Sequence, residues 1–224
     1  MATQMIRGAL AASVLAATVL GCGPTAQAVP QASDGATARV AVGPSDPITV
    51  DVVTVNGSGC PAGTAVVRPL ADNTGFTIGY TSYVATAGGA VAPTDFRKNC
   101  QLSLLVHVPQ GFTYAIARAD YAGTARLATG ASGLQRANYY FQGSSVDTYS
   151  DHELSGPLYG RWSATDSTAV ADLVYAPCGV DRILNVNTEL RVDAGTSTLT
   201  SSLRMSSTSG SVNTVYHFSW QECS

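Results

Sequence analysis

The chain has 224 residues, in which 12 Lys and Arg face 15 Asp and Glu for a formal net charge of −3. It holds a single lysine, Lys98, and no basic cluster, which excludes nucleic acid as a partner because phosphate binding needs a stripe of cations. Charged residues make up only 12% of the chain, while Ser, Thr, Gly and Ala abound, a composition typical of an extracellular β-protein.

The first 28 residues have the pattern of a secretory signal peptide. A short start ends at the basic Arg7, an uncharged apolar stretch runs over 8–20, and small residues with a cleavage pattern at Ala26-Gln27-Ala28 follow. The apolar stretch is too short to span a bilayer as a helix, which takes about 20 residues. We therefore predict a secreted protein without a transmembrane segment, whose mature chain begins near Val29.

The same region carries the pattern of an alternative, a lipoprotein. Val19-Leu20-Gly21-Cys22 resembles the bacterial lipoprotein box, in which Cys22 would be lipidated and become the new N-terminus. Leu20 is a poor residue at its position in that box, and Ala26-Gln27-Ala28 suits an ordinary signal peptidase. We favour the released protein and keep the lipid anchor at Cys22 as the alternative.

Residues 29–47 are rich in Ala, Gly, Pro and Ser without periodicity, which predicts a flexible N-terminal leader. From Ile48 onward, apolar residues recur with a period of two. This alternation predicts antiparallel strands with one face over a core. The apolar faces are Phe76, Ile78 and Tyr80; Leu102, Leu104, Val106 and Val108; Leu184, Val186, Thr188, Leu190 and Val192; Leu199, Leu203 and Met205; and Thr214, Tyr216, Phe218 and Trp220.

Turn signals separate these runs, for example at Gly88-Gly89, Pro109-Gln110-Gly111 and Ser209-Gly210. No window keeps an apolar stripe of helical spacing, so we expect little helix. Many short strands at regular spacing predict one all-β domain over 48–224, an antiparallel β-sandwich, with a barrel as second choice.

Four cysteines lie in the predicted mature chain: Cys60, Cys100, Cys178 and Cys223. An even number in an exported chain favours two disulfides, and four cysteines permit three connectivities. We favour Cys60–Cys100 and Cys178–Cys223, which join neighbours along the chain. Zinc is disfavoured because there is no Cys-x-x-Cys pair and the spacings match no zinc module.

Several segments together are similar to one family. They are 56–64 (NGSGCPAGT), 97–102 (RKNCQL), 108–112 (VPQGF), 137–143 (ANYYFQG), 177–179 (PCG), 185–188 (NVNT) and 220–223 (WQEC). The chain resembles the domain of unknown function 4360 family of small secreted proteins from actinobacteria and fungi, over roughly 48–223. The resemblance implies a secreted, β-rich protein, and it brings no catalytic residues.

No catalytic motif stands out along the chain. There is no Gly-x-Ser-x-Gly elbow, and His107 and His217 fall opposite the apolar faces of their strands, so we assign no catalytic residue. His152-Glu153 begins a zinc motif whose second histidine is missing. Asp147, Asp151 and Glu153 lack the pattern of a calcium loop and indicate a solvated acidic loop. We therefore predict no cofactor and no metal site.

The glycine-rich stretch 57–63 matches neither a phosphate loop nor a dinucleotide turn, and it predicts a tight loop that presents Cys60 for bridging. Asn56-Gly57-Ser58 is also an N-glycosylation sequon, which has meaning only in a eukaryotic source. Exposed aromatic rings on a β-sandwich can stack on sugars. The candidates for such ligand-facing rings are Tyr140, Tyr149, Tyr159 and Trp162.

Missing catalytic motifs and a hydroxyl-rich β-surface favour a noncatalytic extracellular module that binds envelope polysaccharide or an envelope protein. One alternative is a secreted hydrolase such as a glycosidase, with two carboxylates gathered in a groove. Another is a structural or inhibitory secreted protein. These hypotheses differ in whether a concave site with converging acids exists.

Overall fold

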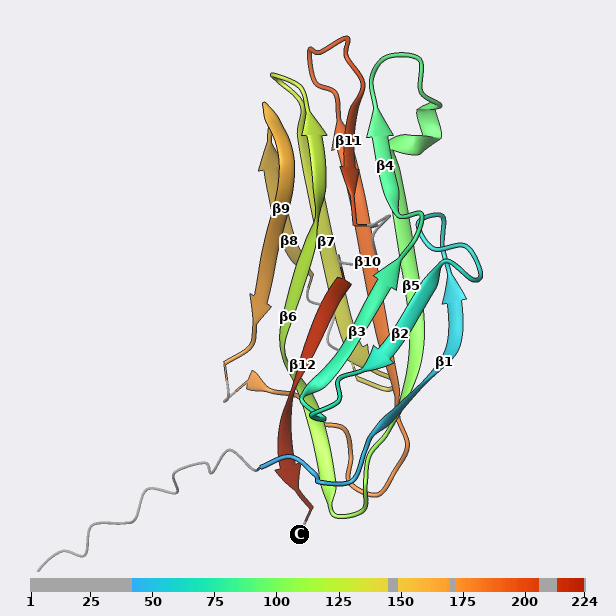
Figure 1. The fold of residues 1–224 in the computed structure, drawn as a ribbon, viewed down its shortest axis with the longest axis vertical. Helices are drawn as coiled ribbons and strands as arrows, with labels where there is room; N and C mark the ends of the chain where they lie inside the picture. The colour runs from blue at the N-terminus through green and yellow to red at the C-terminus, as the bar shows by residue number, and fades with distance from the viewer. Residues whose placement is uncertain (1–41, 145–148, 170–171, 206–212, 224) are drawn as a thin grey trace, which may run out of the picture. The chain divides into compact units, whose positions relative to one another are not determined.

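The computed structural model describes residues 42–144, 149–169, 172–205 and 213–223. These residues form two antiparallel β-sheets that lie face to face, as Figure 1 shows, which confirms the predicted β-sandwich and rejects the barrel. The predicted signal peptide, Cys22 and Asp147 lie outside the described residues.

Sheet A has five strands in the order β1-β5-β10-β7-β8. Their bounds are Thr49–Asn56 for β1, Arg97–His107 for β5, Ile183–Asp193 for β10, Ser132–Phe141 for β7 and Ser150–Ser155 for β8. Every neighbouring pair is antiparallel.

Sheet B has the order β2-β3-β12-β6-β11-β4, and β9 pairs with the other edge of β6. Their bounds are Ala65–Pro69 for β2, Gly75–Tyr80 for β3, Asn213–Glu222 for β12, Phe112–Leu127 for β6, Ser201–Arg204 for β11, Val84–Ala87 for β4 and Leu158–Ser167 for β9. The edge strands β1 and β2 lie at one side of the sandwich, and β8 and β9 lie at the other (Figure 1).

The core lies between the sheets because alternate side chains of each strand point inward. On β10 the predicted apolar face is buried from Leu184 to Val192, while Asn185 and Asn187 on the opposite face stay partly exposed. Leu203 and Met205 are buried as predicted, whereas Leu199 is 63% exposed because it precedes the start of β11. Little helix was expected, and Pro93–Phe96 forms a short 3₁₀ turn.

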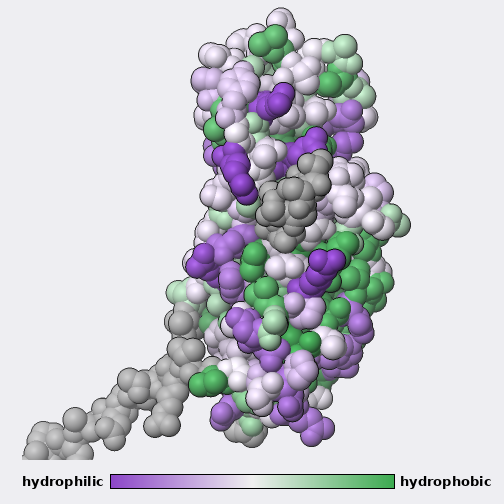
Figure 2. Space-filling model, viewed as in Figure 1, coloured by the Kyte–Doolittle hydropathy of each residue, from purple (hydrophilic) through white to green (hydrophobic). Residues whose placement is uncertain are grey.

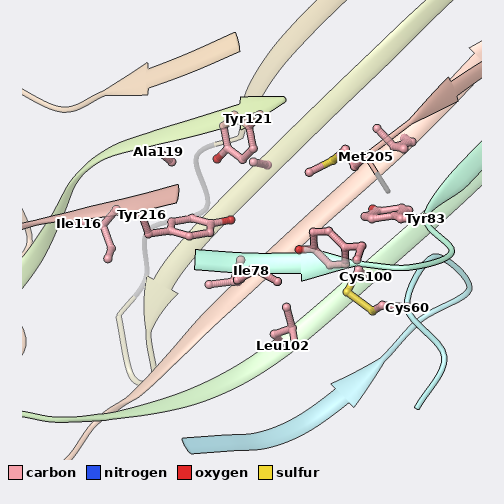
Figure 3. Packing of buried hydrophobic residues seen from close by; sticks show 14 of the residues in the cluster. Cys60, Ile78, Tyr83, Cys100, Leu102, Ile116, Ala119, Tyr121, Met205 and Tyr216 are labelled. Atoms are coloured by element: carbon pink, nitrogen blue, oxygen red, sulfur yellow. A yellow bond between two sulfur atoms is a disulfide. The ribbon is translucent and has the colours of Figure 1, made fainter. Parts of the chain in front are cut away.

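Tyrosines fill much of this core. Tyr83, Tyr121 and Tyr216 are fully buried, and Figure 3 shows them among Ile78, Leu102 and Met205. The ring of Tyr216 stacks on that of Phe76 with 4.9 Å between centroids. Burial raises the pKa of the three phenols well above its ordinary value, because an ionised phenolate has no solvation there.

The disulfides are Cys60–Cys100 and Cys178–Cys223, the predicted pairing. The loop before Cys60 needs its glycines. Gly57 has a φ of 134°, and a Cβ there would lie 2.2 Å from the backbone oxygen of Asn99. A Cβ on Gly59 would lie 2.2 Å from the ring of Tyr83. The loop therefore brings Cys60 against β5, as its composition predicted.

Part of the segment predicted as a leader is bonded to the domain. The side-chain amide of Asn73 donates to the carbonyls of Pro44 and Asp46, both at 2.9 Å, and its oxygen accepts from the amide of Ile48. The indole of Trp220 donates to the carbonyl of Asn73. Residues 44–48 thus form a strap across Asn73, which composition alone did not reveal.

Within the described residues, no helix has the length and apolarity to cross a membrane.

Candidate functional site

The outer face of sheet A carries a row of amide side chains across four strands. Asn56 of β1 is in register with Gln101 of β5, Gln101 with Asn187 of β10, and Asn187 with Asn138 of β7. Residues in register lie on the same side of a sheet, and the next residues along, Leu102 and others, are buried in the core. Asn56 and Gln101 are exposed, Asn187 is half-buried and Asn138 is buried. We call these four residues the amide row.

A second polar row lies beside the amide row. Ser103, Asn185 and Tyr140 are in register on β5, β10 and β7. The hydroxyl of Ser103 donates to the side-chain oxygen of Asn185 at 3.0 Å. The two rows together give one face of the domain a continuous surface of amide and hydroxyl groups, with partly exposed donors and acceptors.

Charged residues follow on the other side of the amide row. Glu189 is almost buried and is paired with both Arg97 and Arg191. The guanidinium of Arg136 donates two hydrogen bonds to Asp151, at 2.6 and 2.5 Å, and these bonds lower the pKa of Asp151. Each of the three arginines is paired with an acid, but Glu189 is shared by two of them, so these five residues keep a net charge of +1.

The four aromatic candidates are not gathered on one surface. Tyr140 lies in the second polar row, and the guanidinium of Arg136 lies 5.3 Å from the ring centroid of Tyr149, which is 51% exposed. Tyr159 is on β9 of sheet B and is 67% exposed. Trp162 was expected to face a ligand, but it is 7% exposed and packs in the core, which leaves its ring little surface for one. Only Tyr140 and Tyr149 belong to the sheet A side.

Trp162 is buried for a local reason. On β9 it is in register with Gly123 of β6, and a Cβ on Gly123 would lie 2.6 Å from the indole. The missing side chain at Gly123 makes room for the ring between the sheets. Two strands far apart in sequence create this slot, so composition around Trp162 could not show it.

A cavity of about 290 Å³ opens beside the end of the amide row. β8 pairs with β7 only as far as Ala137, opposite Ser150, so beyond that point no strand of the described chain covers this edge of β7. Asn138 and Tyr140 line the cavity and also belong to the two polar rows. The polar surface and the cavity are therefore continuous.

Sequence comparison identifies the family of this chain. The sequence model of the family described as "Domain of unknown function (DUF4360)" matches residues 46–223. The chain belongs to this family. It is also 33% identical over 178 residues to a protein of Arthroderma benhamiae named "Uncharacterized secreted protein", a match that covers 80% of this chain and 73% of that protein. The resemblance recognised in the sequence is thus confirmed.

The three histidines of this DUF4360 domain each contact a carboxylate. His107 lies 2.9 Å from Asp51 on the surface, and His217 lies 2.8 Å from Asp120. Burial raises the pKa of Asp120, but hydrogen bonds from Thr165, Arg118 and His217 outweigh it and leave this pKa below the ordinary value. These contacts give both surface histidines a structural role.

His152 is different because it points between the sheets. Its Nε2 lies 2.8 Å from Asp166, which is 7% exposed and also accepts a hydrogen bond from the hydroxyl of Tyr121 at 2.9 Å. His152 is on β8 and Asp166 on β9, so this pair joins the two sheets at their shared side. Sequence analysis missed it, since neither spacing nor motif relates the two residues.

A second cavity, of about 690 Å³, lies at the charged end of the same face. Glu153, Arg191 and Asp193 line it, together with Phe96 and Leu134. It brings two carboxylates to the wall of one cleft. Among the described residues, no group of three or more His, Cys, Asp or Glu could hold a metal ion.

Proposed function

We propose that this DUF4360 domain is a secreted, noncatalytic module that binds polysaccharide of the cell envelope through the outer face of sheet A. The secreted location draws support from the name of the fungal relative, from the two disulfides and from the signal-peptide pattern over residues 1–28. N-terminal sequencing of the secreted protein tests it: we expect a start at Val29, whereas a lipid-modified Cys22 would indicate the anchored form.

The amide row is the observation that carries the proposal. A primary amide offers a donor pair and an acceptor at a fixed angle, so it can bond to two neighbouring hydroxyls of one sugar. Adjacent strands are about 4.8 Å apart, so Gln101 and Asn187 place successive amides at the spacing of groups on one pyranose ring. Tyr140 and Tyr149 add rings at the border of this surface.

The same surface argues against a protein as the main partner. The buried centre of a protein–protein interface is apolar and aromatic. Here the centre is made of Gln101, Asn187, Asn185 and Ser103, and aromatic rings lie only at the border. A hydroxylated polymer exchanges hydrogen bonds with such a face without burying unpaired polar groups.

Substitution on the two faces tests the proposal. We expect the double variant Gln101→Ala with Asn187→Ala to lose retention on insoluble cell-wall polysaccharide by at least tenfold. Gln221→Ala is the matched control, because Gln221 is an exposed strand glutamine in register with Thr113 on sheet B. Equal retention of both variants, or no retention of the unmodified domain on any wall polysaccharide, would overturn the proposal.

The second cavity favours one other candidate function, a glycosidase. Its wall holds Glu153 and Asp193, and glycoside hydrolysis needs two carboxylates on either side of one bond. Asp193 already accepts a hydrogen bond from the amide of Gly195 at 2.8 Å, which suits a turn-stabilising role better than a nucleophile. Release of reducing sugar by the domain, abolished in Glu153→Gln, would favour the hydrolase over the binding module.

A further inference from the structure

The smaller cavity, of about 290 Å³, has an apolar floor and a polar rim. Its floor comes from both sheets: Ile116, Phe141 and Leu184 line it and are each at most 6% exposed. Its rim carries hydroxyl groups from Ser150, Thr168 and Tyr139, and the carboxylate of Asp172. Burial raises the pKa of Tyr139, so that phenol stays neutral.

This arrangement limits what the cavity can hold. At about 290 Å³ it lies at the small end of ligand pockets, which span about 300–1,000 Å³. A sugar hydroxyl placed against Ile116 and Leu184 would lose its hydrogen bonds to water without gaining others, which is unfavourable. The floor therefore selects an apolar group, and the rim selects a polar group directly next to it.

We propose that the cavity accepts the acetamido group of an N-acetylated amino sugar within the polysaccharide bound by sheet A. The methyl group contacts Ile116, Phe141 and Leu184. The amide N–H donates to the carboxylate of Asp172, and the amide oxygen accepts from the hydroxyl of Ser150 or Thr168. This inference rests on the proposed function, because the sugar ring itself lies over Asn138 and Tyr140, which line the cavity and end the polar rows.

Three tetrasaccharides with the same β-1,4 linkage test the inference by calorimetry on the mature domain. They are the tetramer of N-acetylglucosamine, the fully deacetylated tetramer and the tetramer of glucose. We expect the acetylated tetramer to bind at least tenfold more tightly than the other two, since the ammonium group and the hydroxyl are both poorly placed against an apolar floor.

A variant at the rim ties the selectivity to this cavity. Val174 lines it and is 48% exposed, so Val174→Trp obstructs the cavity without disturbing the core, and we expect it to remove the preference for the acetylated tetramer. The control is Val180→Trp, because Val180 is 53% exposed in the same connection but lines a different cavity. Circular dichroism of both variants checks that they fold.

The outcomes separate this inference from the proposed function. Equal affinity for the three tetramers, with retention on wall polysaccharide still lost in the Gln101→Ala and Asn187→Ala variant, overturns the acetamido site and leaves the sheet A face standing. No affinity for any tetramer or any wall polysaccharide overturns both. Chitin and bacterial peptidoglycan both carry N-acetylated amino sugars, and sedimentation of the domain with each purified polymer distinguishes these sources.

Discussion

Gly57 shows how one absent side chain lets the end of β1 approach β5. Its φ of 134° is a conformation that other residues avoid, and the backbone oxygen of Asn99 occupies the place of its Cβ. Gly63 in the same loop also has a positive φ, of 82°, but no atom lies within 4 Å of its Cβ position. Comparing substitutions at the two glycines therefore distinguishes the cost of backbone strain, present at both, from the cost of a steric clash, present only at Gly57.

We expect Gly57→Ala to lower the free energy of unfolding by about 2–4 kcal/mol, because strain and overpacking add. Gly63→Ala is the control and should cost only about 1–2 kcal/mol, from the left-handed conformation alone. Urea unfolding of both variants measures the difference. Equal losses would show that the contact with Asn99 is relieved at no cost.

Tyr149 and Tyr159 are a natural pair for locating the binding face. Both are exposed tyrosines, but Tyr149 lies by Arg136 on sheet A, and Tyr159 lies on β9 of sheet B. We expect Tyr149→Ala to weaken glycan binding about fivefold, the effect of losing about 1 kcal/mol of ring contact. Tyr159→Ala should leave the affinity unchanged. Affinity electrophoresis measures both, and a larger effect at Tyr159 would move the binding surface to sheet B.

The residues that make the candidate site could be predicted only in part. The alternation on β10 placed Asn185 and Asn187 on the polar face, and this proved correct. Their alignment with Gln101 and Asn138 depends on pairing between strands that are distant in sequence, and no local pattern specifies that register. The same limit explains Trp162, whose burial depends on Gly123 of a neighbouring strand.

The strands β8 and β9 are edge strands, and their outer backbone groups have no strand partner among the described residues. Such unpaired edges can pair with other chains. They are held together from within by His152 and Asp166, one from each sheet. Because the hydroxyl of Tyr121 also bonds Asp166, the carboxylate is satisfied although it is buried. The contact therefore joins the two sheets at the side of the sandwich where β8 pairs with β7, the strand that borders the smaller cavity.

The disulfide Cys60–Cys100 connects the loop after β1 to β5, and the sequence separation of its cysteines is 40. Closing such a loop in the unfolded chain is worth about 4 kcal/mol in the chain-entropy account. We expect the double variant Cys60→Ser with Cys100→Ser to lose about that much unfolding free energy while it keeps a β-type spectrum. Thermal and denaturant unfolding measure the loss, and an unchanged stability would contradict a structural role for this bridge.

Strands with a clear alternation of apolar and polar residues could be predicted from the sequence. The disulfide pairing could be predicted too, because cysteines that follow each other along the chain are also close in space. The strap at residues 44–48 was not. It is held by Asn73, whose side-chain amide donates to the carbonyls of Pro44 and Asp46. These partners are distant in sequence, so the composition of a segment rich in Pro, Ser and Gly could not predict the contact. Pro44 and Asp46, within the predicted leader, are thus hydrogen-bonded to the domain.

Across the domain, the tyrosine core sets the response to alkaline pH. Burial raises the pKa of Tyr83, Tyr121 and Tyr216 far above the ordinary value of about 10, which the unfolded chain retains. Below pH 10 both states keep these protons, so stability does not depend on them. Above pH 10 only the native state keeps them, and stability falls as pH rises.

We therefore expect cooperative unfolding above about pH 10, with phenolate absorbance at 295 nm appearing in step with the loss of the β-type circular-dichroism signal. If all tyrosines ionised near pH 10 with the spectrum unchanged, the buried phenols would have access to water, contrary to the packing described above.

Exposed hydrophobic residues gather at one edge of the domain, beside the β1 end of the amide row. Figure 2 shows hydrophobic residues gathered near β1 and β2, where Val52, Val53 and Val66 are exposed. The rest of the amide row crosses β5, β10 and β7 on the outer face of sheet A, with paired charges on one side and the smaller cavity beside Asn138. A hydrated polymer suits this second surface better than the valine-lined edge.

The most direct measurement is a titration of the isotope-labelled domain with a soluble wall oligosaccharide, followed by nuclear magnetic resonance of the side-chain amides. We predict that the signals of Gln101, Asn185 and Asn187 shift with one common dissociation constant, while that of Gln221 on sheet B stays in place. Shifts confined to sheet B, or none at saturating oligosaccharide, would contradict the assignment of the outer face of sheet A as the binding surface.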